Sequence, residues 1–122
     1  MIVLYNIMVN SPGSLDAVFA ALADPTRRRI VERLARGSLT VGEIAAEFPI
    51  SQPAISRHVR VLEESGVLDR RVDGRVHHCT LAPDAMNGAA GWIGKQTAFW
   101  NSALDRLGEV LNEPAPRKKR RT

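Results

Sequence analysis

Cysteine is nearly absent from this chain of 122 residues, since Cys79 is the only one. A single thiol excludes a disulfide within the chain and fits a reducing compartment, so we expect a cytoplasmic protein. Histidine is scarce too, with three residues. No nucleophile, base and acid stand together in a recognisable catalytic set, so we predict that the protein is not an enzyme and needs no cofactor.

Long hydrophobic runs are also missing. The first ten residues, MIVLYNIMVN, are apolar, but Asn6 interrupts the run and no basic residue precedes it. Such a run is too short to span a membrane and makes a poor signal peptide. We therefore interpret residues 1–14 as an N-terminal arm and expect no membrane partner.

Positive charge is confined to a few places. The formal net charge is +4, but residues 117–121 alone supply +5, which leaves 12 cations and 13 anions in the rest of the chain. Within that near-neutral part, five arginines lie between Asp24 and Arg36. Local basic patches on a near-neutral body suit a protein that touches phosphate with one face. Residues 112–122 read as a basic disordered tail.

The residues from Thr40 to Ser65 predict two short helices joined by a tight turn. Val41, Ile44 and Phe48 follow the spacing of one buried helical face. The step Pro49-Ile50 ends that helix, and Ser51 is a good N-cap for the next. Two helices so joined form a helix-turn-helix, whose second helix enters the major groove of DNA.

The second helix carries polar and cationic side chains on the side opposite its apolar residues Ile55, Val59 and Leu62. Gln can pair with adenine, Arg with guanine, and Ser with several base edges or with phosphate. A solvated face of an ordinary helical hairpin is the alternative. The residues that we expect to face DNA from this helix are Ser51, Gln52, Pro53, Ser56, Arg57 and Arg60.

Two β-prone runs follow, Val67 to Val72 and Val76 to Leu81, separated by Asp73-Gly74. An Asp-Gly step between such runs is a strong hairpin signal. A hairpin directly after a reading helix is the wing of a winged helix. We expect its arginines, Arg70, Arg71 and Arg75, to contact phosphates or the minor groove.

The helices on either side of this segment have two further predicted roles. Asp24-Pro25 begins a helix with Arg27 and Arg28 in its first turn, where the helix dipole does not favour cations, so a phosphate partner is one explanation. The last helix, Pro83 to Leu111, carries an apolar stripe too broad for a terminal helix packed on one small domain, and the first helix carries an apolar side as well. Packing within the core alone is the alternative. We predict a homodimer interface from Leu15, Val18, Phe19, Leu22, Ile93, Trp100, Leu104, Leu107 and Leu111.

Three segments in order, LADPTRRRIVERLARG (22–37), TVGEIAAEFPISQPAISRHVRVLEESGVL (40–68) and DGRVHHCTL (73–81), resemble the ArsR-type bacterial transcriptional repressors. The resemblance covers residues 15–111. It implies a fold that is mainly α with a small β-hairpin, a homodimeric winged helix-turn-helix. It also implies binding of double-stranded DNA at a partly palindromic operator and repression of transcription. By position, it places Ser51, Gln52, Pro53, Ser56 and Arg57 in the reading helix and Arg75 in the wing.

The sequence departs from the family's familiar metal sites. Members that sense metals use a Cys-x-Cys motif on the first helix of the helix-turn-helix, or Asp and His pairs on the last helix. Here the first segment reads GEIAAEF, and the last helix has no histidine, so we expect no metal site of either kind. Two alternatives stay open: a sensor that responds through His77, Cys79 or the dimer helices, and a protein–protein docking module.

Overall fold

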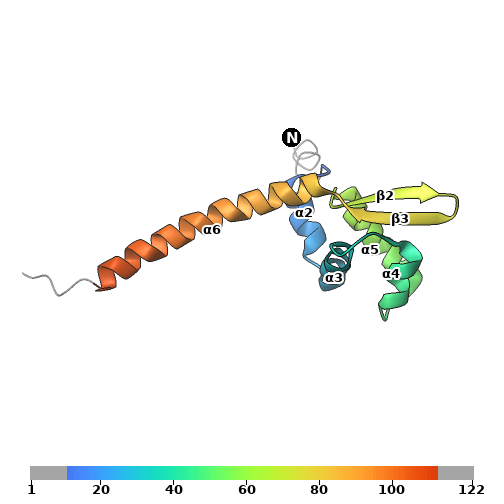
Figure 1. Ribbon diagram of the computed structural model, residues 1–122, viewed down its shortest axis with the longest axis horizontal. Coiled ribbons are helices and arrows are strands. Elements are labelled where there is room, and N and C mark those ends of the chain that lie inside the picture. The colour runs from blue at the N-terminus through green and yellow to red at the C-terminus, as the bar shows by residue number, and fades with distance from the viewer. Residues whose placement is uncertain (1–10, 113–122) are drawn as a thin grey trace, which may run out of the picture. The chain divides into compact units, whose positions relative to one another are not determined.

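The computed structural model describes residues 11–112 of the chain. Most of the predicted N-terminal arm (residues 1–14) and of the predicted basic tail (residues 112–122) lies outside that range. Two compact units make up the chain, the first ending at Ala89 and the second beginning at Ala90. Along the chain the elements are α2 (Leu15–Leu22), α3 (Pro25–Leu34), β1 (Leu39–Thr40), α4 (Val41–Glu47), α5 (Gln52–Glu64), β2 (Leu68–Asp73), β3 (Val76–Leu81) and α6 (Pro83–Asn112) (Figure 1).

Side-chain caps fix where the helices of the first unit begin. Ser14, Asp24 and Ser51 each accept a hydrogen bond from the backbone N–H three residues further on. Thr40 and Glu43 form a reciprocal capping box at the start of α4, with donor–acceptor distances of 3.1 and 2.8 Å. Each cap satisfies a backbone donor that has no partner inside its helix. The predicted starts of the two helices of the helix-turn-helix are therefore confirmed.

Gly66 ends the reading helix in a left-handed conformation, with φ of 88°. A second constraint acts on it, because a Cβ at this position would lie 2.7 Å from the backbone nitrogen of Gly13. The Gly13 N–H donates to the Ser65 carbonyl at 2.8 Å. The close approach ties the chain ahead of α2 to the end of α5.

The hairpin turn is shifted by one residue from its predicted position. Asp73 pairs with Val76 as the last rung of the ladder, so Gly74 and Arg75 form the loop. Gly74 takes φ of 64°, whereas Arg75 has a negative φ, which matches a turn with glycine at the first central position. The prediction that Asp73-Gly74 separates the strands is wrong by this one residue, and β2 begins at Leu68 rather than Val67.

A third strand completes the sheet, whose order is β1-β3-β2 with all pairs antiparallel. Leu39 of β1 pairs with Cys79 at the centre of β3. The two residues of β1 are too few to show an alternating pattern, so the sequence did not indicate this strand. Because β1 directly precedes α4, its pairing with β3 connects the wing to the start of α4.

The core of the first unit lies between the helices and the inner face of the sheet. Its fully buried side chains include Ile44 of α4, Ile55 and Leu62 of α5, and Cys79 of β3. The start of α6 adds Ala85 and Ala89 to the same cluster. This arrangement confirms the predicted winged helix-turn-helix and leaves one side of α5 and the wing tip uncovered.

Candidate nucleic-acid interface

The polar surface of α5 divides into two stripes. Gln52, Ser56 and Glu63 follow one another at helical spacing and face the wing, since Glu63 bonds with a wing residue. Pro53, Arg57 and Arg60 form the other stripe and are exposed. This second stripe points away from the buried side of the helix, where Ile55, Val59 and Leu62 have 0% exposure. The second stripe is therefore the part of the reading helix that points farthest from the core.

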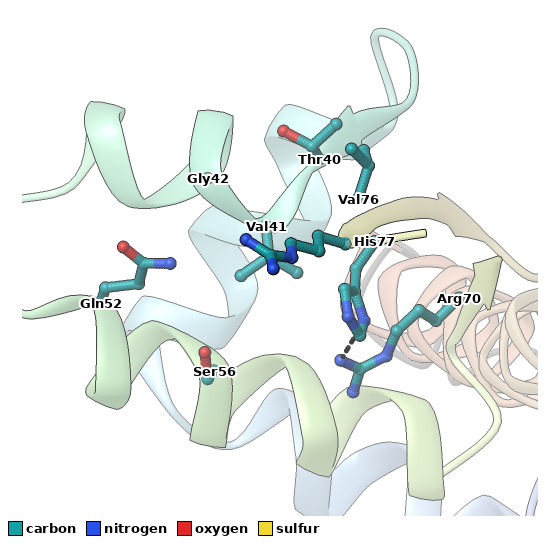
Figure 2. Close-up of a pocket in the computed structure, with 9 residues that line it drawn as sticks. Thr40, Val41, Gly42, Gln52, Ser56, Arg70, Val76 and His77 are labelled. Carbon is teal, nitrogen blue, oxygen red and sulfur yellow. Dashed lines mark hydrogen bonds between the residues drawn. The ribbon is translucent and has the colours of Figure 1, made fainter. Parts of the chain in front are cut away.

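Arg70 is partly buried between the wing and α5. Its Nη2 donates to Glu63 Oε1 at 2.6 Å, and its Nη1 lies 3.2 Å from His77 Nδ1 (Figure 2). Arg70 shares a sheet face with Leu68, because side chains alternate along a strand, and that face covers α5. The guanidinium side chain is only 18% exposed. The predicted phosphate contact of Arg70 stays a prediction, and the structure gives this residue an internal role in joining wing to α5.

Arg27 also has internal partners. Its Nε donates to the Ala21 carbonyl at 2.6 Å and its Nη2 to the Ala20 carbonyl at 3.3 Å, so it satisfies the end of α2. Its Nη1 lies 3.3 Å from His58 Nδ1 of α5. The side chain thus links α2, α3 and the reading helix, and its predicted phosphate contact likewise stays a prediction.

Asp24 sits beside this arginine as the N-cap of α3. The backbone N–H of Arg27 donates to Asp24 Oδ2 at 3.0 Å and holds the pKa of this carboxyl below its ordinary value. Partial burial opposes that shift, and the nearby charges of His58 and Arg27 reinforce it. The carboxylate is therefore stabilised in its charged form at the start of α3.

The other predicted contact residues are accessible. Ser51 at the tip of α5 is exposed, as are Arg71 on β2 and Arg75 in the hairpin loop. Arg71 follows Arg70 directly and so points to the opposite face of the sheet. Arg28 is exposed as well, and its Nη1 donates to the Leu22 carbonyl at 2.8 Å. The accessible cations lie on α3, on α5 and at both sides of the hairpin tip.

Cys79 is in the core, with 0% exposure. Burial raises the pKa of its thiol, while the charge of Arg70 acts in the opposite direction. A buried, protonated thiol is a poor nucleophile and a poor metal ligand. His77, which lies two residues before Cys79 on the same sheet face, is engaged with Arg70. Among residues 11–112, no three His, Cys, Asp or Glu side chains gather into a group that could hold a metal ion.

The predicted dimer residues fall into two groups. Val18 has 0% exposure within its own unit, so its assignment to a subunit interface is wrong: this side chain serves the core. Leu15, Phe19 and Leu22 are partly buried against that core. The predicted residues of α6 are different, since all are exposed: Ile93, Trp100, Leu104, Leu107 and Leu111.

A reading helix that turns a cationic stripe away from its core, followed by a hairpin with arginines at its tip, defines the winged helix-turn-helix class of DNA-binding proteins. Residues 22–71 match the family described as a helix-turn-helix domain. Over 99 residues the chain is 39% identical to the HTH-type transcriptional regulator Rv2034 of Mycobacterium tuberculosis, covering 81% of this chain and 90% of that protein. Over 99 residues it is also 43% identical to the arsenical resistance operon repressor of Escherichia coli strain K12, covering 80% and 82%.

Solved structures agree with these relatives. The crystal structure of the ArsR family transcriptional regulator RHA00566 superposes with a TM-score of 0.66 at 37% identity, covering 71% of this chain and 96% of that one. The homodimeric winged helix-turn-helix DNA-binding domain Mb0332 from Mycobacterium bovis gives 0.56 at 25% identity, covering 67% and 75%. The chain therefore belongs to the ArsR family of transcriptional regulators. None of the helices between residues 11 and 112 combines the length and the hydrophobicity that a membrane span requires.

Proposed function

We propose that this protein is a cytoplasmic repressor that binds a partly palindromic DNA operator as a homodimer, is not an enzyme, and works without a metal or other cofactor. The observation that carries the proposal is the exposed stripe of Pro53, Arg57 and Arg60, which faces directly away from the core of a winged helix. In a major groove this stripe reaches base edges, and Arg57 can make a bidentate contact with guanine.

The exposed face of α6 supports the dimer. Trp100 is 61% exposed and Leu111 72%, and they belong to a row of large apolar side chains along the helix. A second copy of the chain is the partner that can cover such a face by two-fold symmetry. The homodimeric state of the Mycobacterium bovis domain supports the same assignment. Two reading helices would then meet half-sites about 34–36 Å apart, or at a multiple of that spacing.

Repression is supported by the relatives, of which one is the repressor of an arsenical resistance operon. The absence of Cys and His from GEIAAEF and from α6 supports a metal-independent protein. The thiol-sensor alternative loses support because Cys79 is buried in the core. The docking-module alternative keeps one observation in its favour, the exposed face of α6.

Fluorescence anisotropy tests the proposal. The purified protein is titrated against duplex from the upstream region of its own gene and against a scrambled duplex of equal length, at two salt concentrations. We expect binding of the upstream duplex to survive the higher salt while scrambled binding collapses, because base contacts depend less on counterion release than phosphate contacts do. Equal, salt-sensitive binding to both duplexes would contradict sequence-specific recognition of the upstream DNA and would favour the docking module.

A further inference from the structure

A groove of about 440 Å³ lies between the start of α4, the wing-facing stripe of α5 and the wing. Figure 2 shows Gln52 and Ser56 on the α5 side of this space, Thr40 to Gly42 across from them, and Val76 and His77 at the wing. The lining residues are Thr40, Val41, Gly42, Gln52, Ser56, Arg70, Arg75, Val76 and His77.

The chemistry of the lining is one-sided. It holds two arginines, a histidine, two hydroxyls and an amide, and none of its residues is Asp or Glu. The charge of Arg70 is offset by Glu63, whereas no hydrogen bond or ion pair to the Arg75 guanidinium occurs within residues 11–112. Thr40 Oγ1 accepts a bond from the Glu43 N–H, which leaves its hydroxyl proton free to donate. The groove thus offers hydrogen-bond donors and one available cation.

The position of the groove indicates which anion it meets. If the exposed stripe of α5 enters a major groove and the hairpin tip lies at the neighbouring minor groove, the strand that separates the two grooves runs between α5 and the wing. The groups that this strand presents there are its phosphates. Gln52 and Ser56 line the groove at this boundary, whereas Arg57 and Arg60 do not.

We propose that this groove binds one phosphodiester group of the operator backbone, with Arg75 as its cation and Ser56 and Thr40 as hydroxyl donors. The inference rests on the proposed function and divides the polar surface of α5 between two tasks. The stripe with Arg57 reads bases, and the stripe with Gln52 and Ser56 holds the strand beside them. Thr40 then has a second role besides capping α4.

The salt dependence of DNA binding separates the two tasks. Arg75→Gln should reduce the slope of log affinity against log salt by about 0.9 for each phosphate that the variant no longer neutralises, on operator and scrambled duplex alike. Arg36→Gln is the matched control, because it removes the same charge from an exposed residue after α3 that does not line the groove. An unchanged slope for Arg75→Gln, or an equal reduction for Arg36→Gln, would overturn the proposal.

A backbone scan locates the phosphate that the groove holds. An uncharged methylphosphonate replaces one phosphate at a time in a half-site, and each duplex is titrated with wild type, Arg75→Gln and Ser56→Ala. We expect one position at which the replacement weakens wild type but has little further effect on either variant, because the variants do not hold that phosphate. Ser56→Ala keeps good helix propensity, and circular dichroism confirms its fold. Additive effects at every position would overturn the assignment.

A final arm separates DNA from a free phosphate compound as the source of the anion. Inorganic phosphate is titrated into the operator complex against sodium chloride of equal ionic strength. We expect the two salts to displace DNA equally. Extra displacement by phosphate that disappears in Arg75→Gln would assign the groove to a free phosphate ligand and overturn the backbone contact. Absence of any operator preference in wild type would instead contradict the proposed function.

Discussion

The helices α5 and α6 are both amphipathic, yet α5 leaves its polar face uncovered and α6 leaves its apolar face uncovered. Three large apolar side chains of α5, Ile55, Val59 and Leu62, are fully buried. Apart from Val61, which is 37% exposed, the surface that α5 presents is mainly polar and cationic. Along α6 large apolar side chains stay exposed, with Leu104 at 56% and Trp100 at 61%. A polar face with arginines suits the edges and phosphates of DNA, and an apolar face suits a second apolar surface. The uncovered face of each helix therefore indicates the kind of partner it takes.

The stability cost of a Leu→Ala substitution should differ most strongly between the two helices. Leu62→Ala removes a fully buried side chain of α5 and should lower the free energy of unfolding by about 2–5 kcal/mol. Leu104→Ala removes an exposed side chain of α6, so its cost should come only from weaker dimerisation and fade as the protein is diluted. Urea unfolding at several protein concentrations measures both. A concentration-independent destabilisation by Leu104→Ala would break the comparison.

A charge on the apolar face of α6 should separate the subunits. Leu104→Asp should weaken the dimer by at least about 30-fold, because about 2 kcal/mol or more is lost when an interface must hold an unpaired carboxylate. Asn101→Asp adds the same charge to an exposed polar position of the same helix and serves as the control. Sedimentation equilibrium gives the dissociation constants. Equal dimer strength in both variants would rule out this face as the interface.

The ion pair between α5 and the wing should have a smaller effect. In a double-mutant cycle of Glu63→Gln and Arg70→Met, we expect a coupling free energy of unfolding of about 0.5–1 kcal/mol, since the pair is partly exposed. DNA affinity should fall in both single variants, because each removes the ion pair that holds the wing against α5. If Arg70→Met weakens DNA binding while Glu63→Gln does not, Arg70 acts on phosphate directly.

Acid titration should give the smallest difference. The pKa of Asp24 is lowered in the folded state, so its carboxylate contributes stability above its unfolded pKa and loses that contribution as pH falls through the folded value. Asp24→Asn keeps an N-cap but does not titrate, so its stability should fall less steeply than that of wild type below about pH 4. Parallel curves for the two proteins would show that this carboxyl has no part in acid unfolding.

Local signals in the sequence were enough for most of the fold. Ser51, Pro53 and Gly66 mark the start and end of the reading helix because capping and φ preferences act over a few residues. The Asp73-Gly74 step predicted the hairpin itself. The turn starts one residue later than predicted, because Gly74 with its positive φ takes the first central position of the turn. The strand β1 was missed because its pairing with β3 depends on residues about 40 positions away.

The candidate site was harder to predict than the fold. Pattern alone shows that Val18 lies on an apolar stripe, but not whether its own chain or a second chain covers that stripe. The partners of Arg27 and Arg70 were likewise hidden, because His58 and Glu63 approach them only after folding. One signal was available: Arg70 comes two residues after Leu68, so side-chain alternation along the strand places it on the inner face of the wing with Leu68.

The measurement that tests the central claim most directly is the ratio of operator to scrambled-duplex affinity for wild type and Arg57→Ala. If the exposed stripe of α5 reads bases, the variant should lose about 1–3 kcal/mol of discrimination. Its affinity for scrambled duplex should change little. Equal weakening on both duplexes would show that Arg57 contacts only phosphate, and would contradict the assignment of this stripe to base reading.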